Sequence, residues 1–357
     1  MLKRFIFAPV LTKFKTKMKK NLRNILALSL GLMTTVAFAQ DWGVDSRTRI
    51  DMSGDNDKMS TDQRVTLGAT WGGSDWGIHV SSDVNYVLEG ENGAAASMGI
   101  YEAYASTDLM GYASLTAGRQ ALNYGSGALL SSNDWAASRT TWDGMTFGLN
   151  LDMADVTIGY HSTNAGMEGD ENNGNMWINA GGEFSGWSVN FLYMTNEVDG
   201  ETGDAATGID ISGEVAGAGI SASMNTDYEG DEMRVIGLTY AVNDDMGVNV
   251  SQTVYGEDGD GTGFNMAGTN MDGSWMETGS LGYLNNGDEI LSYGLTYKMA
   301  GIHLGATMHN VTNADESERD ITEISLGYSL NDNAGLSLSM VDDADVSYMW
   351  LTLNVGL

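Results

Sequence analysis

The sequence predicts an all-β protein, a transmembrane antiparallel β-barrel of about 18 strands, within a range of roughly 16 to 20. Its turns would be short on the periplasmic side, and its extracellular loops longer and acidic. Three observations lead to this fold class. From Asp41 to Leu357, segments of about ten residues carry apolar side chains at every second position. The links between these segments alternate between very short and longer, Asp-, Gly- and Asn-rich. This part of the chain also contains no proline, which would interrupt a ladder of strand hydrogen bonds.

The N-terminal segment has the pattern of a secretory signal. Lys19, Lys20 and Arg23 precede a short apolar run over 25–33, and a small-x-small site follows over 37–39. No later segment approaches the roughly 20 continuous apolar residues that a membrane helix needs. The pattern therefore predicts export and a location in the cell outer membrane.

We expect two regions in the chain. Residues 1–39 would be an N-terminal extension and a signal peptide cleaved after Ala39, and residues 40–357 would be the outer-membrane barrel. Met18 is a second candidate for the true start. The residues before it would then be a gene-model extension or a longer basic region, with a mitochondrial-type presequence as the weaker alternative.

The charge balance is strongly acidic. The chain has 17 Lys and Arg against 48 Asp and Glu, a formal net charge of −31. Residues 1–39 hold eight basic and no acidic residues, so the remainder has nine basic against 48 acidic residues, a net charge of −39. Such a surface repels nucleic acid and attracts cations. A hydrophobic content of 42% with strict alternation argues against disorder, and with no cysteine the stability must come from closure of the barrel.

About eighteen candidate strands follow one another along the chain. They lie at roughly 43–53, 62–72, 75–88, 97–107, 112–119, 142–152, 154–162, 175–184, 186–196, 206–214, 216–226, 231–242, 246–255, 288–298, 301–311, 319–330, 334–341 and 346–356. Tight links such as 73–74 and 331–333 follow every second strand, and longer links such as 256–287 lie between them. This asymmetry puts both chain ends on the periplasmic side. A strand pair hidden in 273–283 would raise the number.

Alternation also assigns two faces to each strand. Apolar sets such as Trp76, Ile78 and Val80 would contact lipid, with Trp and Tyr near strand ends at the membrane interfaces. The opposite face is small and polar, so we expect a lumen that holds water rather than a packed core, wide enough for a channel. A soluble β-sandwich would alternate in the same way, but it needs neither so many strands nor alternating link lengths. The predicted pore-lining residues are Asp45, Arg47, Arg49, Asp51, Arg64, Asp83, Glu102, Glu183, Asp210, Lys298 and Glu323.

The first strand carries a column of mixed charge. Asp45, Arg47, Arg49 and Asp51 lie on one face of it. They would form either an ion-pair ladder along the wall or a strip that orients solutes. We favour the ladder, because charges inside a barrel usually find partners.

One strand–loop–strand stretch carries more information than its periodicity. Within 117–147 the chain reads GRQ-x-L-x-YG, then DW, then R-x-x-W-DG. These residues are Gly118, Arg119, Gln120, Leu122, Tyr124, Gly125, Asp134, Trp135, Arg139, Trp142, Asp143 and Gly144. This stretch resembles the signature of the alginate export family of outer-membrane barrels, whereas the rest of the chain is similar only in strand number and style. The resemblance implies an exporter barrel of about eighteen strands with a strongly basic lumen suited to a polyuronate.

This chain departs from that pattern in its charge. The nine basic residues after residue 39 are too few for a basic tube, and a polyanion would be repelled, so cations or neutral solutes are favoured. Arg119 and Arg139, with Asp134 and Asp143, would either bind a passing sugar or pin the loop 120–141 into the barrel as a plug. We favour the plug, because a loop with apolar side chains such as Leu129 needs something to fold against.

The sequence predicts no catalytic, cofactor or metal site, and therefore no enzyme. His79, His161, His303 and His309 fall on the predicted lumen face, but they are too scattered along the strands for direct chelation. No motif places a nucleophile beside a base. The acidic loop 257–263 lacks the closing Glu of a calcium loop. We expect at most weak divalent-cation binding at several acidic loops, which would also bridge lipopolysaccharide.

Together these observations predict a porin-like channel for the passive passage of small hydrophilic solutes, cations or neutral saccharides. Its expected partners are outer-membrane lipid, lipopolysaccharide and the solutes themselves, and no nucleic acid. A dedicated exporter of an alginate-like polysaccharide is the first alternative. A non-conducting surface barrel for adhesion or anchoring is the second.

Overall fold

The computed structural model describes residues 41–54, 59–88, 96–134, 136, 139–151, 153–162, 174–198, 201–257, 264, 285–343 and 346–356. The predicted signal region and the segment 273–283 lie outside these residues. The described residues contain no helix with the length and hydropathy needed to cross a bilayer.

In the unit that begins at Asp41, the regular elements among the described residues are all strands. Its strands are β1 (Asp41–Asp51), β2 (Ser60–Gly72), β3 (Trp76–Val87), β4 (Ser97–Leu109), β5 (Ala113–Gln120), β6 (Trp142–Leu151), β7 (Ala154–Ser162), β8 (Gly174–Phe184), β9 (Trp187–Val198), β10 (Glu201–Val215), β11 (Ala218–Thr226), β12 (Glu232–Ala241), β13 (Met246–Tyr255), β14 (Glu289–Met299), β15 (Ile302–Thr312), β16 (Glu318–Asn331), β17 (Ala334–Asp343) and β18 (Val346–Gly356).

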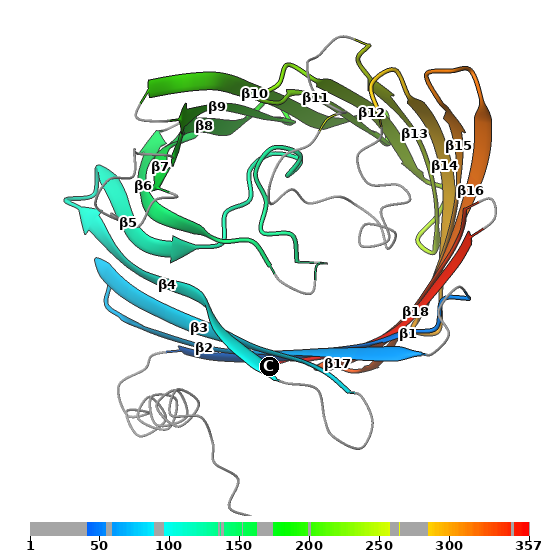
Figure 1. The fold of residues 1–357 in the computed structure, drawn as a ribbon, viewed down its shortest axis with the longest axis horizontal. Coiled ribbons are helices and arrows are strands. Elements are labelled where there is room, and N and C mark those ends of the chain that lie inside the picture. The colour runs from blue at the N-terminus through cyan, green and yellow to red at the C-terminus, as the bar shows by residue number, and fades with distance from the viewer. Residues whose placement is uncertain are drawn as a thin grey trace, which may run out of the picture. The chain divides into compact units, whose positions relative to one another are not determined.

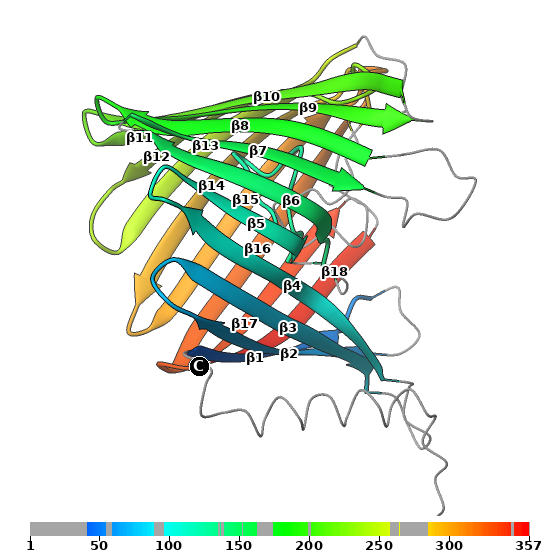
Figure 2. The ribbon, with the colours of Figure 1, turned by 90° about the vertical axis from the view of Figure 1, so that its left-hand side faces the viewer.

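These strands form one 18-stranded sheet that closes on itself. Every strand pairs antiparallel with the next, and β18 returns to pair with β1 from Asp45↔Gly356 to Asp51↔Trp350. Figure 1 looks into the resulting ring, and Figure 2 shows the strands inclined across its side. Closure leaves no strand edge unpaired, which is the condition for strands to lie in hydrocarbon. The predicted antiparallel barrel of about 18 strands is confirmed.

The period-two pattern explains which side chains face out. Along β14, Leu291, Tyr293 and Leu295 are exposed on the outer surface, and Ser292 and Gly294 between them face inward. The same alternation continues from strand to strand because the register pairs inward residues with inward residues, as in Ser292↔His309. Most strand bounds agree with the prediction within two residues. The largest difference is β10, which begins at Glu201 because it continues the pairing with β9 across a register shift.

Short turns join the strands at one end of the barrel, which we call the turn end, and longer links join them at the loop end. Three of the turns are two residues long, with both residues at positive φ: Ser185–Gly186, Ala216–Gly217 and Ala300–Gly301. This is the geometry of hairpin turns whose twist matches that of the strands. Glycine in the second position adopts it without steric strain.

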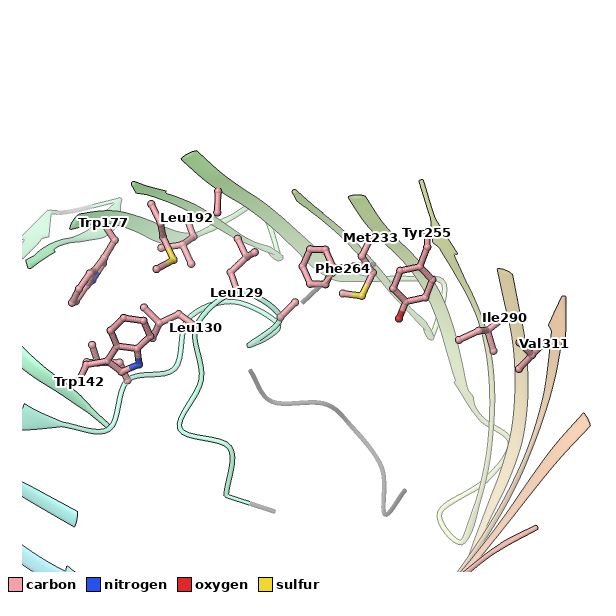
Figure 3. Packing of buried hydrophobic residues seen from close by; sticks show 14 of the residues in the cluster. Leu129, Leu130, Trp142, Trp177, Leu192, Met233, Tyr255, Phe264, Ile290 and Val311 are labelled. Carbon is pink, nitrogen blue, oxygen red and sulfur yellow. The ribbon is translucent and has the colours of Figure 1, made fainter. Parts of the chain in front are cut away.

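The inner wall is not small and polar throughout, which corrects that part of the predicted lumen face. An apolar belt of buried, inward-facing side chains lies toward the loop end, and Figure 3 shows part of it. Its members are Trp177, Leu192, Met194, Ala206, Met233, Tyr255, Ile290, Val311, Ile321, Val341 and Trp350. Leu129, Leu130 and Phe264, from links between strands, pack in the same cluster. Packing of these link residues in the cluster removes apolar surface of both the links and the wall from water.

Candidate functional site

The described part of the link between β5 and β6, residues 121–134, 136 and 139–141, folds into the barrel. Figure 1 shows it inside the ring of strands. Its tip is a tight turn in which Gly127 N donates to Tyr124 O at 3.0 Å and Tyr124 N donates to Leu130 O at 3.2 Å. Gly125 and Gly127 both adopt positive φ there. We call residues 121–141 the inward loop; it narrows the passage through the barrel.

One side of the inward loop is held by apolar packing. Leu129 and Leu130 are 2% and 0% exposed, and Figure 3 shows them beside Leu192, Trp177 and Trp142. Burial of two leucines in this way removes roughly 1.5–3 kcal/mol each of unfavourable apolar hydration. The same packing raises the pKa of the buried Tyr124 phenol, so it stays neutral.

The tip of the loop sits directly on the wall. A Cβ placed on Gly125 would overlap the carboxylate of Asp210 and come within 2.9 Å of Asn190 Nδ2. Ser126 Oγ and Ser223 Oγ share a hydrogen bond of 3.2 Å. Where the tip meets β9 and β10, any larger residue at position 125 would have to displace the Asp210 and Asn190 side chains and adopt a positive φ.

The other side of the loop is held by two arginines from the wall. Arg47 donates to Asp134 O at 3.1 Å and to Ala136 O at 3.4 Å, and Arg64 donates to the same two carbonyls at 3.1 and 3.3 Å. Arg47 and Arg64 lie directly opposite each other on β1 and β2. Like charges in that position repel, so the shared carbonyls stabilise the pair as well as the loop.

A third arginine reaches out from the loop to the wall. Arg139 donates to both oxygens of Asp83 at 2.5 and 3.1 Å and to Thr66 Oγ1 at 3.0 Å. Its guanidinium carbon lies 3.3 Å from the centre of the Tyr101 ring. Burial is the largest single influence and would lower the pKa of Arg139, but the hydrogen bonding to Asp83, together with the charges of Tyr101, Asp83 and Asp134, outweighs it and leaves the pKa raised. We call Arg47, Arg64 and Arg139 the arginine clamp.

The arginines of this wall are therefore buried and bonded. Arg47, Arg49 and Arg64 are 7%, 2% and 7% exposed. Arg49 donates to Asp62 at 3.1 Å, and Arg47 lies 3.7 Å from the same carboxylate. The charge column on the first strand is thus part of a bonded network that extends to β2 and the inward loop.

The exposed inward charge at the turn end is mostly negative. Carboxylates from five strands point inward near their ends there: Asp41, Asp108, Asp155, Glu183 and Glu214. Lys298 on β14 is the exposed inward cation among the described residues of the same end. We call these five carboxylates the acidic arc. Such an arc attracts cations and repels anions.

The remaining predicted pore-lining residues also fall on the inner face. By register, Asp45, Asp51, Glu102, Asp210 and Glu323 point inward together with the arginines described above. The structure brings Arg47, Arg64 and Asp83 together around the inward loop. It leaves Glu183 and Lys298 apart from that cluster, at the turn end.

The motif residues divide between the two faces. Arg139 and Asp134 lie in the clamp, but Arg119 and Asp143 form their ion pair, at 2.6–2.7 Å, on the outer face. They share the outward side with Leu115 and Met145, so neither pins the inward loop nor meets a solute in the lumen.

Two other motif residues, Gln120 and Gly144, make contacts within the wall. Gln120 accepts a hydrogen bond from Thr146 on the inner wall at 2.9 Å. Gly144 has no room for a Cβ beside Tyr160 O. Trp135 lies outside the described residues.

Three contacts of the loop were not predicted from the sequence. Thr66 and Ser223 carry no motif, although their inward parity could have been read from the alternation. Tyr101 is inward because a register shift opposite Ser81 and Ser82 inserts an extra residue in β4. A bulge of this kind leaves no mark in an alternating pattern.

Comparison with known proteins places the fold. No family model matches the chain, and no curated protein matches it. Among solved structures it is similar to OccK1 (OpdK) of Pseudomonas aeruginosa, with a TM-score of 0.69 and 12% identity over 90% of this chain and 99% of that one. OccAB4 of Acinetobacter baumannii gives a TM-score of 0.63 and 11% identity over 88% and 97%. The chain shares the barrel fold of these proteins.

A third similar structure is Pseudomonas aeruginosa OpdK with vanillate, with a TM-score of 0.67 and 11% identity over 90% of this chain and 99% of that one. Another structure of OpdK names it an outer membrane protein. At these identities the likeness shows the fold alone. It agrees with the barrel fold and does not support the resemblance to alginate exporters.

Proposed function

We propose that this protein is a porin-like channel of the cell outer membrane for small hydrophilic solutes, with a preference for cations and neutral solutes over anions. The closed barrel with an apolar outer face supports insertion in a bilayer. The porin-type neighbours support passive passage. The inward loop would set the size limit, and lipid with lipopolysaccharide would surround the barrel.

One observation carries the charge preference. The inward arginines near the loop are buried and bonded, whereas the carboxylates of the acidic arc are exposed. A solute therefore meets mainly negative charge at the turn end, although arginines are present inside. Vanillate, bound in one similar structure, is an organic anion. We expect anions of that kind to pass this barrel less readily than cations or neutral solutes.

The test is a planar-bilayer measurement on the purified barrel under a KCl gradient. We expect stable single-channel steps and a reversal potential of the sign that K⁺ preference gives. Neutralising three of the five carboxylates of the arc, in an Asp155→Asn/Glu183→Gln/Glu214→Gln variant, should move that potential toward zero. Anion preference in the unaltered barrel would refute the proposed selectivity.

A second candidate is a non-conducting surface barrel for adhesion or anchoring. The inward loop, which is bonded to opposite parts of the wall, favours it, because a loop held in this way fills part of the lumen. Absence of conductance from a folded, inserted barrel would select this function. A polysaccharide exporter has no comparable observation in its favour.

A further inference from the structure

Two hydroxyl–imidazole–carboxylate arrays lie on the inner wall, each across three consecutive strands. In the first, Thr70 Oγ1 lies 2.9 Å from His79 Nδ1, and His79 Nε2 lies 3.6 Å from Glu102 Oε2. In the second, Ser292 Oγ lies 2.7 Å from His309 Nδ1, and His309 Nε2 lies 3.9 Å from Glu323 Oε2. Neither array includes a residue of the arginine clamp.

We propose that the first array, His79 with Glu102, is a two-ligand site for a borderline divalent transition-metal ion such as Zn²⁺. The separation of 3.6 Å is too long for a hydrogen bond. It is within a few tenths of an ångström of the edge between two ligands of a tetrahedral zinc ion, about 3.3–3.4 Å for bonds of about 2.0–2.1 Å. The two atoms are thus spaced much as two ligands of one metal ion would be.

A second group hydrogen-bonds the other polar atom of each ligand. Thr70 fixes the imidazole through Nδ1, and the Ala121 amide donates to Glu102 Oε1 at 3.1 Å, leaving Oε2 toward His79. Tyr104 stacks on the imidazole with ring centroids 5.1 Å apart. When Nδ1 donates to Thr70, the Nε2 lone pair faces the carboxylate, and a cation between them relieves that repulsion. Supports of this kind are the rule around metal-bound histidines and carboxylates.

Water can complete the coordination. The His79 and Glu102 side chains are each about one-fifth exposed to the lumen. Within the described residues no group of three or more His, Cys, Asp or Glu gathers around a metal position, so the remaining ligands would be water. The site would therefore be of modest affinity and exchangeable. It also touches the inward loop, since Ala121 is the first residue of that loop.

The second array is a built-in control. It has the same chemistry, but its nitrogen–oxygen separation is wider and its histidine side chain is only 9% exposed. A metal ion in water therefore has less access to it. His309→Asn removes an inward histidine that also lies between a hydroxyl and a carboxylate, without touching the proposed site.

The experiment measures Co²⁺ absorption and Zn²⁺ calorimetry on the full barrel in detergent, with folding checked by its heat-dependent shift in gel mobility. We expect His79→Asn and Glu102→Gln to abolish a binding component that His309→Asn keeps. Thr70→Val, which removes only the support, should weaken it about 10-fold. Mg²⁺, which prefers oxygen ligands, should not compete.

Binding that survives His79→Asn, or that is lost equally in His309→Asn, would overturn the proposal. Uptake of a proton by the pair between pH 5 and 8, with no absorption or heat signal from added metal, would overturn it too. That result would mean that the pair holds only a proton. The measurement needs no conduction, so a silent barrel would refute the channel and leave this site standing.

Discussion

The inward loop is held at two places by different physics. On the side of β8 to β11, Leu129 and Leu130 pack against apolar wall residues, and a glycine tip lies on Asp210. On the side of β1 to β4, the arginine clamp holds the loop through carbonyls and a carboxylate. Apolar packing does not depend on any one charged partner, whereas a charge-assisted bond is lost when its partner is removed. The comparison suggests a fixed anchor on one side and an adjustable one on the other.

The largest effect should come from breaking the apolar anchor. In a Leu129→Ala/Leu130→Ala variant, each truncation should cost about 2–5 kcal/mol of loop docking. The loop should then leave the wall, which would raise single-channel conductance and expose the loop to chymotrypsin. Leu295→Ala on the outer face is the matched control and should change neither. An unchanged conductance in the double variant would mean that the clamp alone holds the loop.

Breaking the clamp should have the next largest effect. Arg139→Gln leaves Asp83 buried without its cation, a loss of about 3–5 kcal/mol. We expect noisier channel currents, because one side of the loop is released while the other stays docked. The Arg139→Gln/Asp83→Asn variant should recover part of the loss, and a double-mutant cycle on loop proteolysis measures how much. No recovery would show that Arg139 acts through Tyr101 or Thr66 instead.

The glycine at the tip tests the fit between loop and wall. Gly125→Ala should cost about 1–3 kcal/mol, because the added methyl overlaps the Asp210 carboxylate. Gly217→Ala is the control: Gly217 also has a positive φ, +82° against +57°, but open space around it, so this variant reports backbone strain without an overlap. Gly125→Ala should lose more thermal stability than the control, and it alone should raise proteolysis of the inward loop. Equal losses of stability with unchanged proteolysis would mean that the Asp210 side chain moves aside without cost.

The alternation in the sequence predicted the wall well. A period of two, together with long and short links, was enough for 18 strands and for the inward side of Arg47, Arg64 and Asp83. The alternation also predicts an outward Arg119, which has the same parity as the outward Leu115. The motif resemblance instead predicted a role for Arg119 with the loop, and that prediction is wrong.

The path of the inward loop was beyond the reach of periodicity. The sequence predicted that residues 120–141 enter the barrel, but not that Leu129 meets Leu192 or that Arg139 meets Tyr101. Such contacts join residues far apart in the chain, and a loop has no repeating pattern to fix them. The apolar belt was missed for the same reason. A few inward apolar residues on each strand do not by themselves predict a buried cluster, because their burial depends on the segment that packs against them.

The smallest effect should come from the outer of the two motif arginines. Arg119 and Arg139 match the same motif, but Arg119 pairs with Asp143 on the outer face, where both side chains are exposed. Exposed pairs contribute roughly 0–1 kcal/mol. Arg119→Gln should therefore leave conductance and loop proteolysis unchanged, with at most a slight loss of thermal stability. If it matched Arg139→Gln in opening the loop, the outward assignment of β5 would be wrong, and the register from β4 to β6 would have to shift by one residue.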